Sequence, residues 1–367
     1  MKKLTRIFCT VLVIGCTSLQ TGIGEAQDPR EDASSITQAA ARRGGIISVI
    51  GGGGDLAVAL AKRGEFTVHC VQLDEQTRDM VRQRADAAGL DGAISATVAR
   101  VDRWPYAAGL LNIVVVEDWP RLQKEGLSGA ELARVVAPLG HVFVKMSTDT
   151  AGLTRQLENA GLEAADRADK KAGWASFRKP YPEQIDQWTH YLHGADGNPV
   201  AEDEVVGPPR HYQWISGPDW LKSHETVSSI TTMVTAQARL FYIEDKGPTS
   251  LAGQHELPDK WFLVARDAFN GRFLWEVPIR RWGWREWKSS WFSPRPGDVP
   301  LNIQKKLVAV GDNVFVTLGY HAPVSMLDAQ TGKIKQTYSE TNPTLEILHH
   351  DGTLILSVLS SDERIKL

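Results

Sequence analysis

The sequence predicts an α/β domain with a parallel sheet, followed by an all-β region that forms a partial β-propeller. Between residues 34 and 180, short apolar runs alternate with segments of helical periodicity, which is the pattern of β-α-β units. From residue 181 on, short strands and turns replace that pattern. Tryptophan follows the same division, since none of the 12 precedes Trp104 and nine lie between Trp188 and Trp291.

Composition excludes several classes of protein. The 367 residues are 42% hydrophobic and 23% charged, so the chain is neither disordered nor collagen-like. A formal net charge of −3 gives no electrostatic footprint for nucleic acid or for an anionic membrane surface. Three cysteines are too few for a disulfide scaffold.

The N-terminus predicts a signal peptide over residues 1–26. Three basic residues among the first six precede an apolar run over 7–16, which is too short to cross about 30 Å of hydrocarbon as a transmembrane helix. Two processing sites remain open. Cleavage after Ala26 follows a small-x-small site, whereas residues 13–16 resemble a lipobox that would leave a lipid anchor on Cys16.

A signal peptide predicts a periplasmic or cell-envelope protein. The polar, acidic residues that follow it, 27–33, predict a linker. The α/β domain is expected over 34–180 and the partial propeller over 181–367. No nucleic-acid partner and no transmembrane helix is expected.

Apolar runs predict the strands of the α/β domain. These runs cover residues 46–50, 67–73, 96–101, 112–116 and 142–144, with two further strand segments near 162–168 and 174–179. The fourth run is almost wholly apolar, as expected for a central parallel strand. The helices between them are predicted to begin at an Asp55 N-cap, after Asp74, at a Ser128-x-x-Glu131 capping box and near residue 150.

Four consecutive glycines, Gly51 to Gly54, follow the first strand and precede a helix. Such a turn lets backbone N–H groups approach a ligand closely. Asp74 and Asp102 come at the ends of the second and third strands, and an acid at the end of the second strand is placed to bind ribose hydroxyls. Gly51, Gly53, Asp74 and Asp102 are therefore the candidate cofactor-binding residues. The alternative is that the glycines only form a tight turn.

Residues 45–180 resemble a class I S-adenosylmethionine (SAM)-dependent methyltransferase. The resemblance rests on the first glycine motif, on Leu73-Asp74, on Val101-Asp102 and on the segment 132–140 before the fifth strand. It implies SAM as the cofactor, Asp74 as the ribose-binding acid and Asp102 as the acid on the adenine side. It also implies a terminal hairpin that dinucleotide-binding domains lack.

Three departures from this family bear on activity. Val49 stands where many members carry an acid, and Asp55 replaces the third glycine of the motif. After the fourth strand, Glu117-Asp118-Trp119-Pro120 replaces an Asn-Pro-Pro-Tyr acceptor motif. Methyl transfer requires a positioned nucleophile, and the sequence identifies none. The expectation is a catalytically inactive domain, with no catalytic residue assigned.

Two similar units recur in the β region, over residues 263–275 and 324–336. Asp267 and Asp328 are 61 residues apart, as are Gly271 and Gly332. Each unit has a strand, an Asp-Ala-x-x-Gly turn and a second strand. The glycine supplies a positive φ, and the aspartate side chain can accept hydrogen bonds within the turn. Further hairpins are predicted over 234–243, 307–317 and 345–356, and two hairpins make a four-stranded blade.

The Asp-Ala-x-x-Gly-x-x-x-Trp unit resembles the repeat of the pyrroloquinoline-quinone-like (PQQ-like) β-propellers, and Asp186-Gln187-Trp188 resembles their opening segment. The blades are expected over 231–275 and 305–338, with half of a third, which predicts a truncated propeller. Redox members of this family use calcium and a vicinal disulfide against the quinone. The sequence has no cysteine after Cys70, so PQQ is not expected as a cofactor.

Two further clusters have two interpretations each. His190-x-x-His193 could share a helix face with Asp186 as metal ligands, although such spacing is common by chance and no third strong ligand is evident. The tryptophan-rich insert over 282–287, with Trp291, could form an interface with a protein partner or pack between blades.

The sequence therefore favours a non-catalytic scaffold at the cell envelope, with a protein partner bound through the propeller. The first alternative is a SAM-dependent methyltransferase that acts through the candidate cofactor-binding residues. The second alternative is a quinoprotein-like oxidoreductase, which the missing cysteines disfavour.

Overall fold

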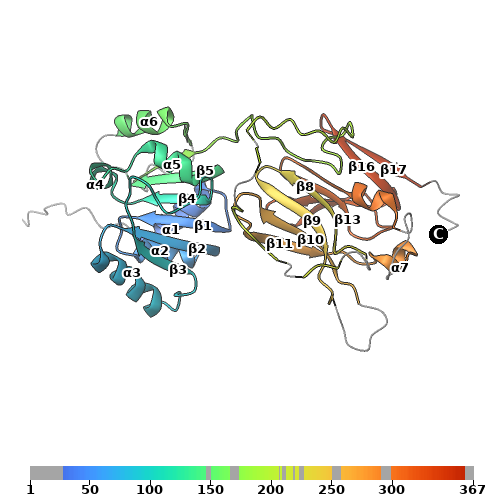
Figure 1. The fold of residues 1–367 in the computed structure, drawn as a ribbon, viewed down its shortest axis with the longest axis horizontal. Helices are drawn as coiled ribbons and strands as arrows, with labels where there is room; N and C mark the ends of the chain where they lie inside the picture. The colour runs from blue at the N-terminus through green and yellow to red at the C-terminus, as the bar shows by residue number, and fades with distance from the viewer. Residues whose placement is uncertain are drawn as a thin grey trace, which may run out of the picture.

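A computed structural model of the chain describes residues 28–145, 150–165, 173–205, 207–208, 212–217, 220–222, 227–249, 258–290 and 299–359. The predicted signal peptide, including Cys16, and Trp291 lie outside these residues. Two parts, an α/β domain and a β domain, lie side by side (Figure 1). Within the described residues no helix is both long and apolar enough to span a membrane.

A seven-stranded sheet forms the centre of the α/β domain, in the order β3-β2-β1-β4-β5-β7-β6. Strands β1 to β5 are parallel, whereas β7 runs antiparallel to β5 and β6 antiparallel to β7. This order with its terminal hairpin confirms the expected Rossmann-like methyltransferase fold. The strands are β1 (Gly44–Ile50), β2 (Glu65–Gln72), β3 (Ile94–Val98), β4 (Leu111–Val116), β5 (Val136–Lys145), β6 (Glu163–Ala164) and β7 (Trp174–Arg178).

Helices cover both faces of this sheet. One apolar core joins the sheet to α1, α2 and α3, and a second joins the opposite face to α4, α5 and α6. All six residues of β4 are buried, as its apolar sequence predicts. The helices are α1 (Pro29–Ala39), α2 (Asp55–Ala61), α3 (Glu75–Ala87), α4 (Trp119–Lys124), α5 (Gly129–Val135) and α6 (Thr150–Asn159).

The prediction of a linker over residues 27–33 is wrong, because α1 begins at Pro29. The Asp28 side chain accepts a hydrogen bond from the backbone of Arg30 and caps the helix, and Pro29 suits its first turn. Ala33 and Ile36 lie one turn apart and are buried in the first core. The acidic residues Glu31 and Asp32, just before Ala33, are typical of a solvated segment, although the apolar stripe that follows them is that of a packed helix.

The Ser128-x-x-Glu131 capping box is confirmed, since Ser128 Oγ accepts a hydrogen bond from the Glu131 backbone N–H at 3.2 Å. The N-cap prediction for Asp55 is wrong by one residue. Gly54 occupies the cap position with a φ of 102°, and Asp55 is the first helical residue. A left-handed backbone suits glycine there, and Asp55 then contributes its charge to the first turn of the helix.

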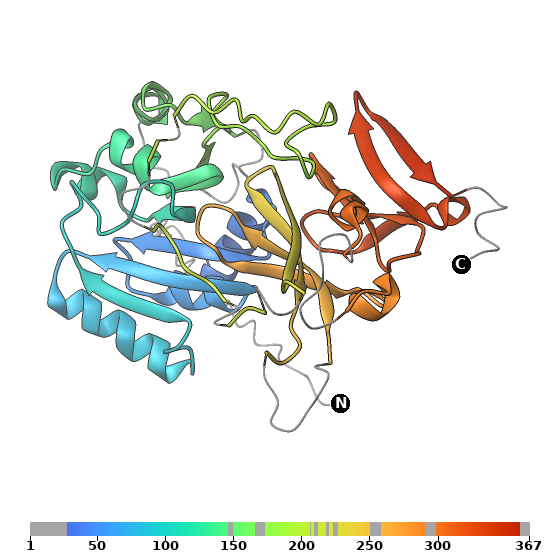
Figure 2. The same cartoon turned by 45° about the vertical axis from the view of Figure 1, so that its right-hand side comes forward.

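The β domain contains two four-stranded antiparallel sheets, in the orders β11-β10-β9-β8 and β12-β13-β14-β15, and a two-stranded sheet of β16 and β17. Strand β8 packs beside β12, and β12 beside β16, so the three sheets lie next to one another in chain order (Figure 2). The described residues contain no closed ring of sheets. The elements are β8 (Ile230–Ala236), β9 (Arg239–Asp245), β10 (Trp261–Asp267), β11 (Phe273–Pro278), α7 (Trp284–Trp287), η2 (Leu301–Lys306), β12 (Leu307–Val310), β13 (Asn313–Thr317), β14 (Val324–Asp328), β15 (Ile334–Thr337), η3 (Ser339–Thr341), β16 (Thr344–His350) and β17 (Thr353–Val358).

The two Asp-Ala-x-x-Gly turns have matching hydrogen bonds. The backbone N–H of Gly271 donates to Asp267 O at 2.9 Å, and that of Gly332 donates to Asp328 O at 2.8 Å. In each turn the aspartate Oδ1 accepts from the backbone two and three residues further on. Both glycines have a φ near 70°, as the turn chemistry predicts.

A tryptophan from the preceding segment packs on each turn. Trp275 Nε1 donates to Ala329 O at 3.0 Å, and its ring lies so close to Gly332 that an added β-carbon would be 2.7 Å away. Trp214 Nε1 donates to Ala268 O at 3.1 Å and covers Gly271 in the same way. In both repeats, therefore, the indole of an earlier tryptophan packs on the turn glycine and links that turn to the preceding segment of the chain.

The first of these turns also joins the two domains. Asn112, fully buried in β4, donates from Nδ2 to Asp267 Oδ2 at 2.8 Å. Its Oδ1 accepts from the backbone of Ile46 and from Asn270 Nδ2, both at 2.8 Å. Asn270 Nδ2 donates as well to Leu110 O at 3.0 Å. A buried hydrogen-bond network thus fixes the β domain against the strands of the α/β domain.

Candidate functional site

The glycine turn lies between β1 and α2, at the carboxyl edge of the parallel strands, where α/β proteins bind ligands. Gly51 and Gly54 have φ values of 87° and 102°, so the turn uses the left-handed backbone that the sequence predicts. The candidate residues Gly51 and Gly53 both belong to it.

Side chains of the chain itself cover the middle of this turn. A β-carbon on Gly52 would lie 1.8 Å from Glu117 Oε1, and one on Gly53 would lie 2.4 Å from Arg84 Nη1. Arg84 donates a hydrogen bond to Gly53 O and forms an ion pair with Asp55 at 3.3 Å. A β-carbon at either position would therefore require one of these side chains to move. Both groups that cover the turn are the ends of flexible side chains.

Glu117 directly follows β4, and its Oε1 is buried without a hydrogen-bond partner. Burial raises the pKa of Glu117 to about 7, with the Lys145 ammonium acting in the opposite direction and Asp32 and Asp55 adding to the rise. Burial of an unpaired carboxylate is unfavourable in free energy, because the charged form loses its hydration. The protonated form is therefore favoured. The turn therefore faces an acid that is half ionised near neutral pH.

Asp32 and Trp174 complete the surroundings of Glu117. The Asp32 carboxylate, which is 3% exposed, accepts from Trp174 Nε1 at 2.8 Å and lies 3.9 Å from Lys145 Nζ. The Lys145 ammonium lies 5.6 Å from the centroid of the Trp174 ring. Residues from α1, β5 and β7 thus meet beside the glycine turn.

In the structure Asp74 has a capping role, and ribose binding by this residue stays a prediction. Asp74 lies beyond the end of β2 and caps α3, where its Oδ1 accepts from Thr77 N at 2.7 Å and from Thr77 Oγ1 at 2.9 Å. These hydrogen bonds lower the pKa of Asp74. The last residue of β2 is Gln72, whose side chain is buried and donates to Gly52 O at 3.0 Å. The polar group that reaches the glycine turn from β2 is therefore an amide.

Asp102 lies after β3, where Arg100 donates to both of its carboxylate oxygens. The Arg100 guanidinium lowers the pKa of Asp102. No hydrogen bond or ion pair among the described residues joins Asp74 or Asp102 to the glycine turn. Sequence reasoning missed Asp32, Gln72 and Glu117. A signal existed for Glu117 in its position directly after a buried strand.

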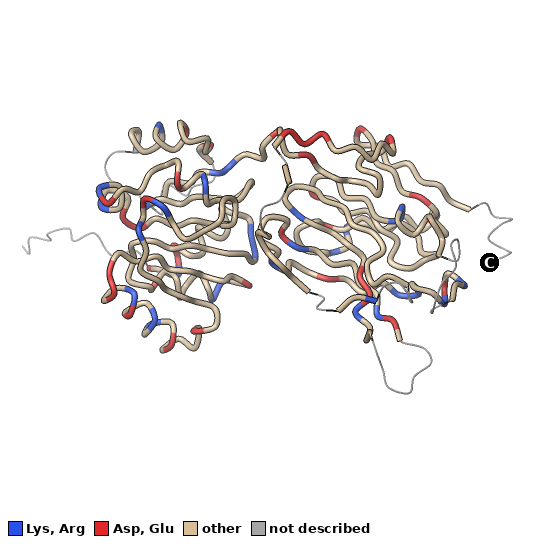
Figure 3. Tube along the Cα trace, in the orientation of Figure 1, with Lys and Arg blue, Asp and Glu red and all other residues tan. Residues whose placement is uncertain are grey.

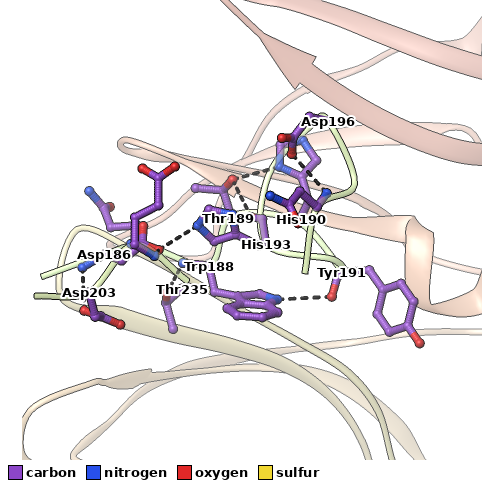
Figure 4. A network of polar contacts seen from close by, with 12 residues as sticks. Asp186, Trp188, Thr189, His190, Tyr191, His193, Asp196, Asp203 and Thr235 are labelled. Atoms are coloured by element: carbon purple, nitrogen blue, oxygen red, sulfur yellow. Dashed lines mark hydrogen bonds and ion pairs between the residues drawn. The ribbon is translucent and has the colours of Figure 1, made fainter. Parts of the chain in front are cut away.

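Asp186, His190 and His193, for which metal ligation was one of two interpretations, form a structural staple that links strands of the β domain. Residues 186–193 are not helical, and Asp186 Oδ2 accepts from His193 Nε2 at 2.6 Å (Figure 4). No group of three metal-ligating side chains is found in the part of the chain that the structure describes. Residues 188–190, between Asp186 and His193, accept hydrogen bonds from all three sheets of the β domain. Thr235 N in β8 donates to Trp188 O, Ala309 N in β12 donates to Thr189 O, and His349 N in β16 donates to His190 Nε2.

We expect acid to weaken this staple through His190. Burial lowers the pKa of His190 to about 4, below its value of about 6.5 in an unfolded chain. Its contribution to stability is therefore complete above pH 6.5 and is lost as the pH falls toward 4, a total of about 3 kcal/mol. Thermal unfolding of the wild type and of His190→Gln between pH 4 and 8 measures this. The amide oxygen of Gln can still accept from His349, so a variant with an equally steep acid loss would contradict the assignment.

The tryptophan-rich insert packs between the sheets. Trp282 and Trp287 are buried, and their rings lie against each other and against Trp261 and Tyr320 in the core of the β domain. This supports the packing interpretation for these two residues. Trp284 is more exposed, with the Arg285 guanidinium 4.1 Å from its ring centroid.

Comparison with known proteins gives structural similarity alone. No family model matches the chain, and no curated protein matches it. A putative SAM-dependent methyltransferase from Methanococcus maripaludis is 16% identical, with a TM-score of 0.35 over 43% of this chain and 87% of that one. A SAM-dependent methyltransferase from Aquifex aeolicus is 14% identical, with a TM-score of 0.34 over 40% and 88%. The cyclase SpnF is 13% identical, with a TM-score of 0.36 over 42% and 81%.

Proposed function

We propose that the α/β domain binds SAM over the glycine turn and serves as a methyltransferase domain. The observation that carries this proposal is Glu117 Oε1, which is buried beside Gly52 without a donor. A buried acceptor that the folded chain leaves unsatisfied costs about 1–3 kcal/mol. A ligand ammonium group would remove that cost, and the methionyl part of SAM carries one.

The residues around the turn fit the donor by their chemistry. Glu117 would hold the ammonium group, and the Lys145 ammonium suits the methionyl carboxylate. Gln72, at the end of β2, offers an amide to the ribose in place of an acid. Arg84 would leave Gly53, which its partly exposed side chain can do. When bound, SAM supplies a methyl group that is activated by a sulfonium. The role assigned to this chain is to bind and orient the donor.

Calorimetry of the full chain with SAM at pH 8 tests the proposal. We expect a dissociation constant in the micromolar range, and a loss of at least tenfold in Glu117→Gln, equivalent to about 1.4 kcal/mol. Glu125→Gln is the matched control, because this exposed acid lies at the end of α4 and outside the turn. Wild-type protein that binds neither SAM nor S-adenosylhomocysteine at 1 mM would overturn the proposal.

The affinity for SAM should also depend on pH. The pKa of Glu117 is raised to about 7, and only its ionised form attracts the ammonium strongly. We expect the affinity to fall as the pH drops from 8 to 6, with no such change in Glu117→Gln. A flat profile in the wild type would place the ammonium elsewhere.

The coverage of Gly52 and Gly53 by Glu117 and Arg84 favours a second candidate function. In it, these side chains close the donor site and the protein acts without catalysis, as an exported envelope scaffold. The β domain, as part of a PQQ-like propeller, would then bind a protein partner. This candidate predicts no binding of SAM by a correctly folded chain, so the same calorimetry separates the two.

A further inference from the structure

A large cleft separates the two domains on the side away from the glycine turn. Its volume is about 1510 Å³, and its walls include Gly44 and Glu65 at the amino ends of β1 and β2, Arg178 at the end of β7, and Phe273 and Gln330 of the β domain. The glycine turn lies at the opposite, carboxyl edge of the same strands. The cleft is therefore a separate site, and nothing about it depends on SAM.

Basic side chains outnumber acidic ones in the walls of this cleft. Four carboxylates belong to it, Glu65, Glu163, Asp312 and Asp328. The walls also contain seven cations. The residues that line the cleft therefore have a net charge of +3, whereas the whole chain has a net charge of −3. Figure 3 shows basic residues on both sides of the junction. The seven cations are Arg42, Arg43, Arg63, Arg178, Arg239, Lys333 and Lys335.

Ion pairs neutralise only part of this charge. Arg239 pairs with Asp312 at 2.9 Å, and Lys335 pairs with Asp328 at 3.1 Å. Arg42 lies 3.4 Å from Asp267, which already accepts from Asn112. For the other four cations, no carboxylate in the described part of the chain lies within 4.0 Å.

Like charges also converge across the domain junction. Arg42 follows α1, Arg178 ends β7 and Arg239 begins β9. Burial lowers the pKa of the Arg42 guanidinium; Asp267 raises it, and Arg239 and Arg178 lower it further. Two domains thus bring guanidinium groups together although these groups repel one another, which is unfavourable without a counter-charge.

We propose that this cleft binds an extended anion that carries two or more phosphate or carboxylate groups. Guanidinium groups offer paired N–H donors that match the oxygens of a phosphate group and those of a carboxylate group. The volume exceeds the roughly 300–1,000 Å³ of typical small-molecule pockets, so a ligand with several charged groups along its length fits better than a single small ion. Since both domains supply cations, such a ligand also holds them together.

Titration calorimetry of the full chain with sodium tripolyphosphate and with sodium citrate, at constant ionic strength, tests this proposal. We expect a dissociation constant below about 1 mM for at least one probe. The variant Arg178→Gln/Lys333→Gln should bind at least tenfold more weakly. These two side chains are exposed and make no ion pair among the described residues, so the fold should not suffer.

The matched control is Lys62→Gln/Arg155→Gln, which removes the same charge from exposed positions outside the cleft. We expect its affinity to stay within twofold of the wild type. Binding of tripolyphosphate alone would assign phosphate ligands, and binding of both probes would assign multivalent anions generally. Absence of binding at 10 mM of either probe, or an equal loss in the control variant, would overturn the proposal.

Discussion

Gly332→Ala is expected to destabilise the β domain by about 4 kcal/mol. The residue has a φ of 69°, and a left-handed conformation costs a β-carbon-bearing residue about 1–2 kcal/mol. The new β-carbon would also meet the Trp275 ring at 2.7 Å, and overpacking adds about 1–3 kcal/mol. Displacement of the ring would break the hydrogen bond from Trp275 Nε1 to Ala329.

Gly311→Ala separates the two costs. Gly311 has a φ of 58° in the neighbouring hairpin, and an added β-carbon there would meet no atom within 4 Å. We expect a loss of only about 1–2 kcal/mol for this variant, from backbone strain alone. Thermal unfolding followed by tryptophan fluorescence measures both. Equal losses would show that the indole does not constrain Gly332.

Asn112→Leu is expected to cost about 4 kcal/mol and to loosen the junction between the domains. It removes the donor to the Asp267 carboxylate and the acceptor for Ile46 and Asn270, all within a buried network. A hydrogen bond to a charged group contributes about 1.5–3 kcal/mol, and the buried donors of Ile46 and Asn270 left without their acceptor add about 1–3 kcal/mol. Both domains should then unfold at a lower temperature and become sensitive to proteases at the junction.

The same substitution in an Asp267→Asn variant shows whether the buried charge of Asp267 causes the loss of stability. In Asp267→Asn, the side chain keeps Oδ1 for its own turn but carries no charge. The same Asn112→Leu change should cost about 2 kcal/mol less in that background, since a neutral group is cheaper to leave unpaired. An equal cost in both backgrounds would mean that packing in β4, and not the charge, sets the effect.

The sheet of the α/β domain could be predicted because its strands are short apolar runs that end at caps and glycines. Helix α1 could not, since it has only about one apolar side chain per turn and its first turn is charged, which is also typical of a solvated segment. Asp74 has a capping role that the prediction left out, because an acid after a strand can cap the next helix as well as bind ribose. Thr77, three residues on, accounts for the cap.

The contacts between distant segments were the least predictable. Asn112 looked like one polar residue in a buried strand, and its partner Asp267 is 155 residues away. The 61-residue recurrence did identify both turns. Trp214 and Trp275 are also 61 residues apart, so the indole that packs on each glycine was present in the same periodicity. The basic cleft has no linear signature, because its walls come from nine separate segments of the chain.

The staple over residues 186–193 sets the order in which the β domain can be completed during synthesis. His190 leaves the ribosome long before its partner, the backbone N–H of His349, which is made 159 residues later. At about 5–20 residues per second, the earlier segment waits some tens of seconds or less for that contact. Until then its imidazole lacks the donor that the finished protein provides. Translation pauses within this interval would prolong the exposure of residues 186–193 to chaperones and proteases.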